Sequence, residues 1–398
     1  MVASGKGKGV DVKSGEFFRS ARRAGLWPEA EAVHHSAVTR ARKKVHWHVF
    51  QDILHDTVKL AYECWPEDPK FSWHGMPVFG IDGSWYDLPP TTEIREEFDP
   101  KSGLQYPGKG HYPQCLVSTA HDVFRRLPIA RTVVPVNSSE RDEVKHLLKF
   151  IPLVCVLLFD RGYPSYELIR YLLKKRRYFV FRCPAQSSFP AIQAFMESEK
   201  EQDEICIDPS CNYLKKTPKM QRKQLKAIKL RVIKLVSPDG TVSVLLTNLH
   251  DQKEFPAQEL ISLYFKRWEV ETHYRDEKTV LEIEEFHGKS CNSIRQELMA
   301  VVIMSVIART LMVLSQTLAG DPREPQFKNA VMTLASEAAV LAADDPEKAT
   351  SVFYEVLQEI RRVIYYRPKK TRPSPPRVTK RRLNKWALSK TKKVAANA

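Results

Sequence analysis

Long apolar runs, a leader segment and paired cysteines are all lacking in this sequence, and each lack excludes a class of protein. No stretch approaches the roughly 18 uninterrupted apolar residues that a membrane-spanning helix needs. The opening segment MVASGKGKGVDVKSGEFF has lysines but no apolar core, so it is unlike a secretory signal. We therefore expect a soluble cytoplasmic protein with no membrane partner.

Cysteine usage argues against a disulfide framework. The seven cysteines are odd in number and show no repeated spacing, which fits a reducing compartment. Cys206 and Cys211 enclose four residues, but no second pair follows at the distance of a zinc site. Four histidines of a basic helical region are interpreted as ordinary surface or core residues: His34, His35, His46 and His48.

Positive charge is abundant and unevenly placed. The 398 residues are 43% hydrophobic and 28% charged, which suits two or three globular domains. The net charge is +16, and residues 367–398 contribute twelve Lys or Arg and no acid. Residues 209–238 also lack acids and carry nine basic residues. Such blocks are typical either of solubilising tails or of arms that bind nucleic-acid phosphates, and charge alone does not separate the two.

The order of apolar patterns predicts an α/β protein with helical ends. Residues 15–75 have helical spacing. Short runs rich in β-branched residues predict strands at 76–82, 114–120, 129–136 and 153–160. The polar, basic segment 184–250 ends in a predicted hairpin around Pro238-Asp239-Gly240. Further helices are predicted from Ser138, from Ser165, from Pro256 past Lys278, from about Ser293, and at 327–342 and 347–365.

The helix predicted from Pro256 carries the sharpest spacing. Tyr264, Arg267, Glu271 and Lys278 lie at offsets 0, 3, 7 and 14. At about 100° per residue they fall within an arc of roughly 60°. A carboxylate between cationic side chains suits a metal ion that meets a nucleic-acid backbone, since Arg grips a phosphate bidentately and Lys acts as a point charge. The competing interpretation is an ordinary i,i+4 salt-bridge face, which spacing alone favours.

Two aspartates follow predicted buried strands. Asp82 ends MPVFGID and Asp160 ends LVCVLLFD, at positions where ligands of open α/β sheets collect. Each could also simply begin a turn at a nearby glycine, and Asp87 is a second choice for the first aspartate. With Glu271 they form a hard-oxygen set of the kind that holds Mg²⁺ or Mn²⁺. Two such ions can drive phosphodiester exchange without a histidine base.

At these residues the chain resembles the bacterial DDE transposases of the insertion-sequence-four family. The matching motifs are GIDGSWYDLPPT, FDRGYPSYELIRYLL and Tyr-x2-Arg-x3-Glu-x6-Lys, the last running from Tyr264 to Lys278. The resemblance covers about residues 35–320 and implies an RNase H-like catalytic domain interrupted by a β-rich insertion, with helical N-terminal and C-terminal regions. It implies metal-binding, catalytic roles for Asp82, Asp160 and Glu271. It also implies contacts to the DNA end for Tyr264, Arg267 and Lys278.

The expected organisation has six segments, and most of the basic charge falls outside the catalytic ones. They are an N-terminal helical DNA-binding region at 1–75, catalytic parts at 76–183 and 251–320, a basic β-rich insertion at 184–250, C-terminal helices at 321–366 and a basic tail at 367–398.

The function implied by the resemblance is DNA transposition by an insertion sequence. A homodimer would bind terminal inverted repeats in double-stranded DNA near the nucleoid, cut them, and join the 3′-hydroxyls to target DNA with two Mg²⁺ ions, for which Mn²⁺ can substitute. The alternatives are a stand-alone metal-dependent endonuclease and an inactive DNA-binding remnant. No Trp lies between Trp85 and Trp268, so a hairpin route with base stacking would need another aromatic, such as Tyr213 or Phe189.

Overall fold

The computed structural model describes residues 9–29, 31–100, 112–187, 189–236, 240–341 and 345–366. These residues belong almost entirely to one compact unit, Met1–Ile364, and a second unit comprises Tyr365–Ala398. The predicted basic tail at 367–398 therefore lies outside the described residues, as do Pro238 and Asp239 of the predicted hairpin.

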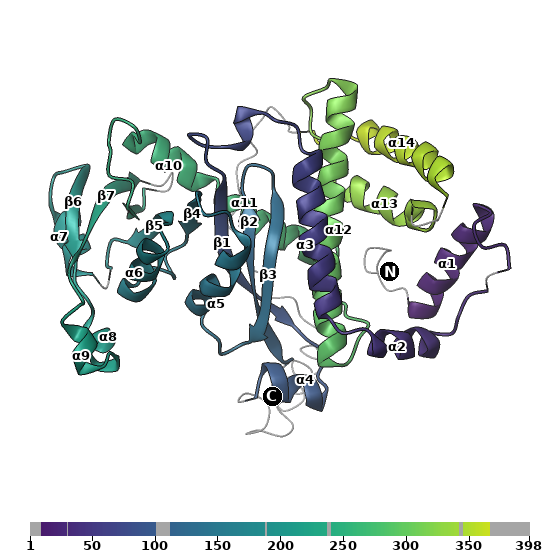
Figure 1. Cartoon of the computed structure of the whole chain (residues 1–398), viewed down its shortest axis with the longest axis horizontal. Coiled ribbons are helices and arrows are strands. Elements are labelled where there is room, and N and C mark those ends of the chain that lie inside the picture. The colour runs from purple at the N-terminus through teal and green to yellow at the C-terminus, as the bar shows by residue number, and fades with distance from the viewer. Residues whose placement is uncertain are drawn as a thin grey trace, which may run out of the picture. The chain divides into compact units, whose positions relative to one another are not determined.

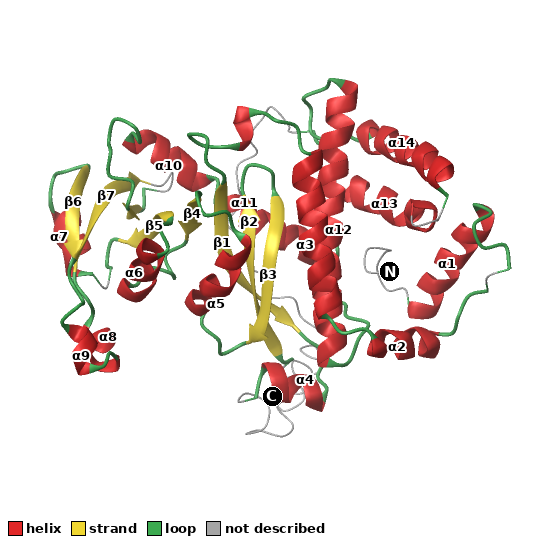
Figure 2. Ribbon diagram, in the orientation of Figure 1, coloured by secondary structure: helices red, strands yellow, loops and turns green. Residues whose placement is uncertain are grey.

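An eight-stranded mixed sheet forms the centre of the first unit (Figures 1 and 2). Its order is β3-β2-β1-β4-β5-β8-β7-β6. β1, β4 and β5 run parallel, and the other neighbours pair antiparallel. The strands are β1 Val78–Asp87, β2 Gln114–Asp122, β3 Leu127–Pro135, β4 Val156–Phe159, β5 Tyr178–Pro184, β6 Gln202–Ile207, β7 Ile228–Val236 and β8 Val242–Thr247. The four strands predicted before residue 161 are thus confirmed, and β7 and β8 are the predicted hairpin strands.

The strands of the basic segment 184–250 extend this sheet and do not form a separate one. β8 pairs with β5, and β7 and β6 follow outward. Some of the basic charge is structural, since Arg231 on β7 is fully buried and donates to the carbonyls of Leu249 and Phe255 at 3.2 and 2.7 Å. The segment is therefore the far edge of the main sheet.

Helices lie against the sheet and beside it, and the longest of them, α12, packs against α3, α13, α14 and β3 (Figure 1). The helices are α1 Val10–Arg23, α2 His35–Lys44, α3 His48–Cys64, α4 Thr92–Phe98, α5 Glu140–Leu147, α6 Tyr166–Lys174, α7 Pro190–Glu197, α8 Cys211–Lys216, α9 Lys219–Arg222, α10 Ala257–Phe265, α11 Trp268–Thr279, α12 Cys291–Ala319, α13 Phe327–Leu341 and α14 Pro346–Arg362.

Helix α12 is the apolar helix around which the helical half is built. Its 29 residues are long and apolar enough to cross a membrane by length and composition, yet 56% of that apolar window is buried inside the structure. A capping box of Ser290 and Ser293 begins the helix, and the left-handed Gly320 ends it. Arg309 on this helix pairs with Asp276 of α11 at 2.9 Å. The apolar surface of α12 thus holds the sheet and the C-terminal helices together.

The prediction of one continuous helix over residues 256–278 is wrong. The structure has two helices there, α10 and α11. At their junction the N–H groups of Lys266 and Arg267 each donate to a carbonyl three residues earlier, at 3.0 Å. Such short-range bonds tighten the backbone and interrupt the regular helix. No Pro or Gly lies at this junction, so the sequence carries no sign of it.

Candidate active site

Two aspartates come together at the ends of neighbouring parallel strands. In the register of β1 and β4, Ile81 is opposite Phe159. The next residues along the two chains are Asp82 and Asp160, so the register carries both carboxylates to the same level and the same side of the sheet. Both side chains are half-buried. The strand ends that the apolar runs predicted are therefore adjacent.

Helix α11 brings a third carboxylate to this pair. Arg267, which caps the helix, donates from Nη1 to Asp82 Oδ2 at 3.2 Å and from Nη2 to Glu271 Oε1 at 2.6 Å. The Arg267 side chain is only 4% exposed, whereas that of Glu271 is 36% exposed. The Tyr274 hydroxyl of the same helix donates to the backbone carbonyl of Asp82 at 2.8 Å. One guanidinium and one hydroxyl thus fasten α11 to the strand that carries the first aspartate.

A glycine makes this close approach possible. A Cβ on Gly80 would lie 2.5 Å from Val270 Cγ2, a distance that real Cβ atoms essentially never show. Gly80 precedes Asp82 by two residues on β1, so both face the same side of the sheet. The missing side chain lets α11 lie directly on β1 and keeps Arg267 and Glu271 within reach of Asp82.

Burial and like charge perturb the first aspartate. Burial raises the pKa of Asp82 to about 7; Arg267 and the Gly83 N–H oppose this, while Glu140 and Asp160 add to it. The positive charge of Arg267 and the Gly83 N–H are therefore not enough to offset the cost of burying the Asp82 carboxylate in its charged form.

The acid Glu140 lies beside the same strand and is absent from the residues predicted for the site. It is the first residue of α5, and a Cβ on Gly83 would lie 2.8 Å from its Oε1. Burial raises the pKa of Glu140, the Tyr163 hydroxyl lowers it, and Asp160 raises it again. The sequence around Glu140 indicates only a helix start, because an acid in the first turn is typical of any helix.

The four residues of the Tyr-Arg-Glu-Lys spacing do not share one exposed face. Tyr264 on α10 is buried, and its hydroxyl makes no hydrogen bond of normal geometry with a described residue. Lys278 donates from Nζ to the Trp85 carbonyl at 2.6 Å, and this Nζ lies 4.5 Å from the centre of the Tyr86 ring. Arg267 is interior, so only Glu271 and Lys278 keep substantial exposure. The break between α10 and α11 explains the difference from a single straight helix.

Three other residues considered from the sequence have different surroundings. Asp87 is exposed and accepts a hydrogen bond from Gln114 Nε2 at 2.8 Å, so Asp82 is the aspartate of the cluster. Phe189 is buried in the core. Tyr213 is half-buried, with its ring centre 5.6 Å from that of Tyr166.

Exposed basic charge of residues 209–238 gathers on α8 and α9, which lie below the outer strands in the view of Figure 2. Lys229 pairs with Glu204 at 2.6 Å and Arg231 is buried, so neither is free to meet a phosphate backbone. The exposed lysines on and directly after the two helices are Lys215, Lys216, Lys219, Lys223 and Lys226.

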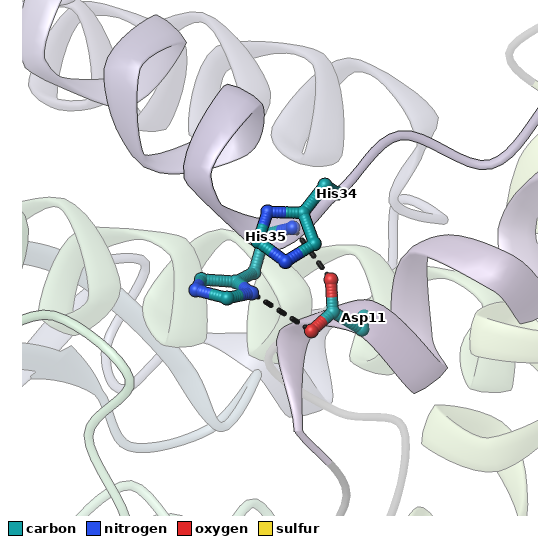
Figure 3. Close-up of side chains that lie close together, drawn as sticks. All are labelled: Asp11, His34 and His35. Carbon is teal, nitrogen blue, oxygen red and sulfur yellow. Dashed lines mark hydrogen bonds and ion pairs between the residues drawn. The ribbon is translucent and has the colours of Figure 1, made fainter.

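Another group of possible metal ligands lies in the N-terminal helices (Figure 3). The ligand atoms of Asp11, His34 and His35 are within 4.8 Å of one another, and all three residues are exposed. Asp11 Oδ1 accepts the His35 N–H at 2.5 Å, and Oδ2 lies 2.8 Å from His35 Nδ1. These contacts tie the start of α2 to α1, so an ordinary helix-capping role accounts for the group.

Comparisons relate the chain to known proteins. The family model described as "Transposase DDE domain" matches residues 73–307. The transposase InsG for insertion sequence element IS4, from Escherichia coli (strain K12), is 23% identical over 282 residues, which are 70% of this chain and 61% of that protein. The chain thus spans less than two thirds of that relative's length. A solved piggyBac transposase synaptic complex with hairpin DNA matches with a TM-score of 0.40 and 10% identity, over 74% of this chain and 59% of the other.

Proposed function

Because the chain belongs to the transposase DDE domain family, we propose that it is a DNA transposase of the insertion-sequence-four type. It would cut DNA at the ends of its element and join the 3′-hydroxyls to target DNA by phosphodiester hydrolysis and transesterification. The observation that carries the proposal is the convergence of Asp82, Asp160 and Glu271 from two strand ends and one helix. Asp82 and Glu271, which are distant in sequence, both accept a hydrogen bond from Arg267, and the strand register brings Asp160 next to Asp82.

The same proposal assigns an RNase H-like catalytic part to β1–β5 together with α11. In support, these strands carry both aspartates, and α11 lies directly against β1 and β2. Strands β6–β8 come between Asp160 and Glu271 in the chain, as an insertion would. Among them β8 pairs with β5, so the insertion is continuous with the catalytic sheet.

Divalent cations fit this cluster by donor type and by charge. Carboxylate oxygens are the ligands that Mg²⁺ and Mn²⁺ prefer. The Asp160 side chain forms no ion pair or hydrogen bond with a described residue, and the pKa of Asp82 is raised to about 7, chiefly by burial and also by neighbouring carboxylates. A bound cation would relieve both conditions. The oxygens of Asp82, Asp160 and Glu271 do not all lie within 4.8 Å of one another, and Arg267 separates two of the three side chains.

Asp82, Asp160 and Glu271 would hold two Mg²⁺ ions, with Mn²⁺ as a substitute. These ions would supply Lewis-acid activation of a water or 3′-hydroxyl and stabilisation of the leaving oxygen. Arg267 orients Asp82 and Glu271 toward each other, because it donates to both from a buried position. The Lys278 side chain is 29% exposed and that of Arg267 is 4% exposed, so Lys278 is the cation of the motif that is better placed to meet a DNA phosphate.

Basic surfaces outside the cluster would hold the DNA. The exposed lysines of α8 and α9 form one such surface, and Lys43 and Lys44 at the end of α2 belong to another. Residues 367–398 would add a non-specific grip through their charge. Two copies of the chain would bring the two transposon ends together, in a bacterial cytoplasm close to the nucleoid.

The test is cleavage and joining of a labelled DNA fragment that carries the element's own ends, with Mg²⁺ present. We expect nicked and joined products with the wild type and neither with Asp160→Ala. Asp87→Ala is the matched control, because Asp87 is an exposed aspartate near the cluster but not part of it; this variant should retain both activities. Cleavage without joining would instead indicate an endonuclease, and wild-type binding without cleavage would indicate a remnant.

A further inference from the structure

The carboxylate of Glu140 lies against the backbone of β1, one residue after Asp82. Side chains alternate along a strand, so Asp82 faces the side of α11 and Gly83 faces the opposite side. There, a Cβ on Gly83 would lie 2.8 Å from Oε1, 2.9 Å from Cδ and 3.0 Å from Cγ of Glu140. Glu140 therefore approaches the cluster from one face of the sheet, while Glu271 approaches it from the other.

The first turn of α5 is fastened to the loop that carries the second aspartate. Arg141 donates from Nε and Nη2 to the carbonyl of Gly162, at 2.9 and 2.7 Å. Gly162 follows Asp160 by two residues. These bonds hold the preceding residue, Glu140, close to the end of β4 as well as to β1.

Positive charge is scarce around Glu140. Its carboxylate forms no ion pair and no hydrogen bond of normal geometry with a described residue, and the neighbouring Arg141 is engaged by Gly162. The Tyr163 hydroxyl, in a residue only 1% exposed, faces Asp82 and Glu140 and also lacks a partner of normal geometry among the described residues. Buried polar groups in proteins nearly always have a partner, often a water or an ion, and a cation bound beside the Tyr163 hydroxyl would supply one. The oxygens of Asp82, Asp160 and Glu140 do not all lie within 4.8 Å of one another, so a cation shared by them would draw the three carboxylates together.

The balance of charges around the cluster also favours a cation near Asp160 and Glu140. Three carboxylates, those of Asp82, Asp160 and Glu271, act on the guanidinium of Arg267. Glu140 adds a fourth negative charge beside Asp82 and Asp160, and Arg141 offsets part of it. Arg267 bonds only to Asp82 and Glu271 among them. The two acids that it does not reach, Asp160 and Glu140, both lack an ion-pair partner among the described residues.

We propose that Glu140 is a fourth carboxylate of the cation site and binds, together with Asp82 and Asp160, one divalent cation of the Mg²⁺ or Mn²⁺ type. The proposal rests on the proposed function, since it assumes that a cation binds at the Asp82–Asp160 pair. It extends the ligand set to a residue on α5 that lies outside the Tyr-Arg-Glu-Lys spacing and both aspartate motifs.

The experiment is a Mn²⁺ titration of the full-length protein, with free Mn²⁺ followed by electron paramagnetic resonance and no DNA present. Glu140→Gln should weaken Mn²⁺ binding about tenfold or more, and Glu140→Asp should weaken it less. Asp142→Asn is the matched control, since it removes one charge from the same helical turn at a side chain that is 65% exposed; its binding should equal that of the wild type. Gly83→Ala should also weaken binding, because the new Cβ displaces the Glu140 carboxylate without removing its charge.

Asp82→Asn separates failure of this proposal from failure of the proposed function. Weakened Mn²⁺ binding in Asp82→Asn with wild-type binding in both Glu140→Gln and Gly83→Ala would overturn the role of Glu140 alone. Wild-type binding in Asp82→Asn would overturn the cation site itself. If Glu140→Gln does not fold, as judged by urea unfolding, the result from Gly83→Ala decides the question.

Discussion

Replacing Gly80 with Ala tests how the site is assembled, because Gly80 has no side chain that could take part in the chemistry. The added Cβ would lie 2.5 Å from Val270 Cγ2 and 3.4 Å from Val123 Cγ1. An ordinary contact between carbon atoms is about 3.5–4.0 Å, so Val270 and with it α11 must withdraw by roughly 1 Å. Overpacking of this kind costs about 1–3 kcal/mol of folding free energy. The variant should therefore remain folded.

Activity should fall even though the variant remains folded. Arg267 and Glu271 move together with the helix, whereas the bond from Arg267 to Asp82 crosses the widened contact and already measures 3.2 Å. Withdrawal of α11 would break this bond and carry Glu271 away from Asp82. A misplacement of about 1 Å in an active site can cost about 100-fold in rate. We expect Gly80→Ala to cleave end DNA about 100-fold more slowly than the wild type.

The assay is single-turnover cleavage of end DNA, with urea unfolding measured on the same samples. Val270→Ala added to Gly80→Ala removes the clashing Cγ2 and should restore the rate to that of Val270→Ala alone. Gly162→Ala is the control, because a Cβ there meets nothing within 4 Å although it lies next to the second aspartate loop. A wild-type rate in Gly80→Ala would refute the reasoning, and a lack of rescue would assign the loss to another cause.

Two further predictions concern stability and DNA binding. Glu277→Gln should lower the free energy of unfolding by about 3–5 kcal/mol, since Glu277 and Arg131 pair at 2.6 Å with neither side chain exposed. Burial raises the pKa of Glu277, but Arg131 and His273 outweigh it and lower the pKa from 4.5 to about 2. The stabilisation is therefore complete above pH 4.5 and is lost as the pH falls toward 2. The urea midpoints of wild type and variant should converge in that pH range, and a constant difference between them would contradict the assignment. Joint replacement of the lysines of α8 and α9 by Ala should weaken binding to all DNA duplexes equally, as measured by fluorescence anisotropy. It should also reduce the slope of log binding constant against log salt concentration by about 0.9 for each phosphate that the protein no longer neutralises. An unchanged slope would show that these helices do not contact DNA. The lysines replaced are Lys215, Lys216 and Lys219 within the helices, together with Lys223, which directly follows α9.

The strands and the two aspartates could be predicted because local chemistry marks them. Asp82 and Asp160 each follow a short apolar run, and parallel strand ends meet at one edge of a sheet. Glu271 needed the family resemblance as well, because spacing alone favoured a salt-bridge face. The ion pair expected by that competing interpretation is present, since Arg267 and Glu271 pair at i,i+4 with 2.6 Å between them, and the metal-binding role of Glu271 stays a prediction. The membership in the transposase DDE family is also confirmed.

The features that could not be predicted all depend on contacts between distant segments. Glu140 joins the cluster because α5 packs onto β1, and no spacing in the sequence records that approach. Strands β6–β8 extend the main sheet because β8 finds β5 as its partner, although more than fifty residues separate them in the chain. The break between α10 and α11 arises from backbone hydrogen bonds that side-chain periodicity does not reveal.

The short motif around the first aspartate has a physical explanation in two glycines that serve opposite faces of one strand. Gly80 and Asp82 face α11, and a side chain at 80 would strike Val270. Gly83 faces α5, and a side chain there would strike Glu140. Helices α11 and α5 can both approach Asp82, one from each face of the sheet, only because Gly80 and Gly83 have no side chains. The four residues Gly-Ile-Asp-Gly therefore supply the aspartate and also allow both helices to approach it closely.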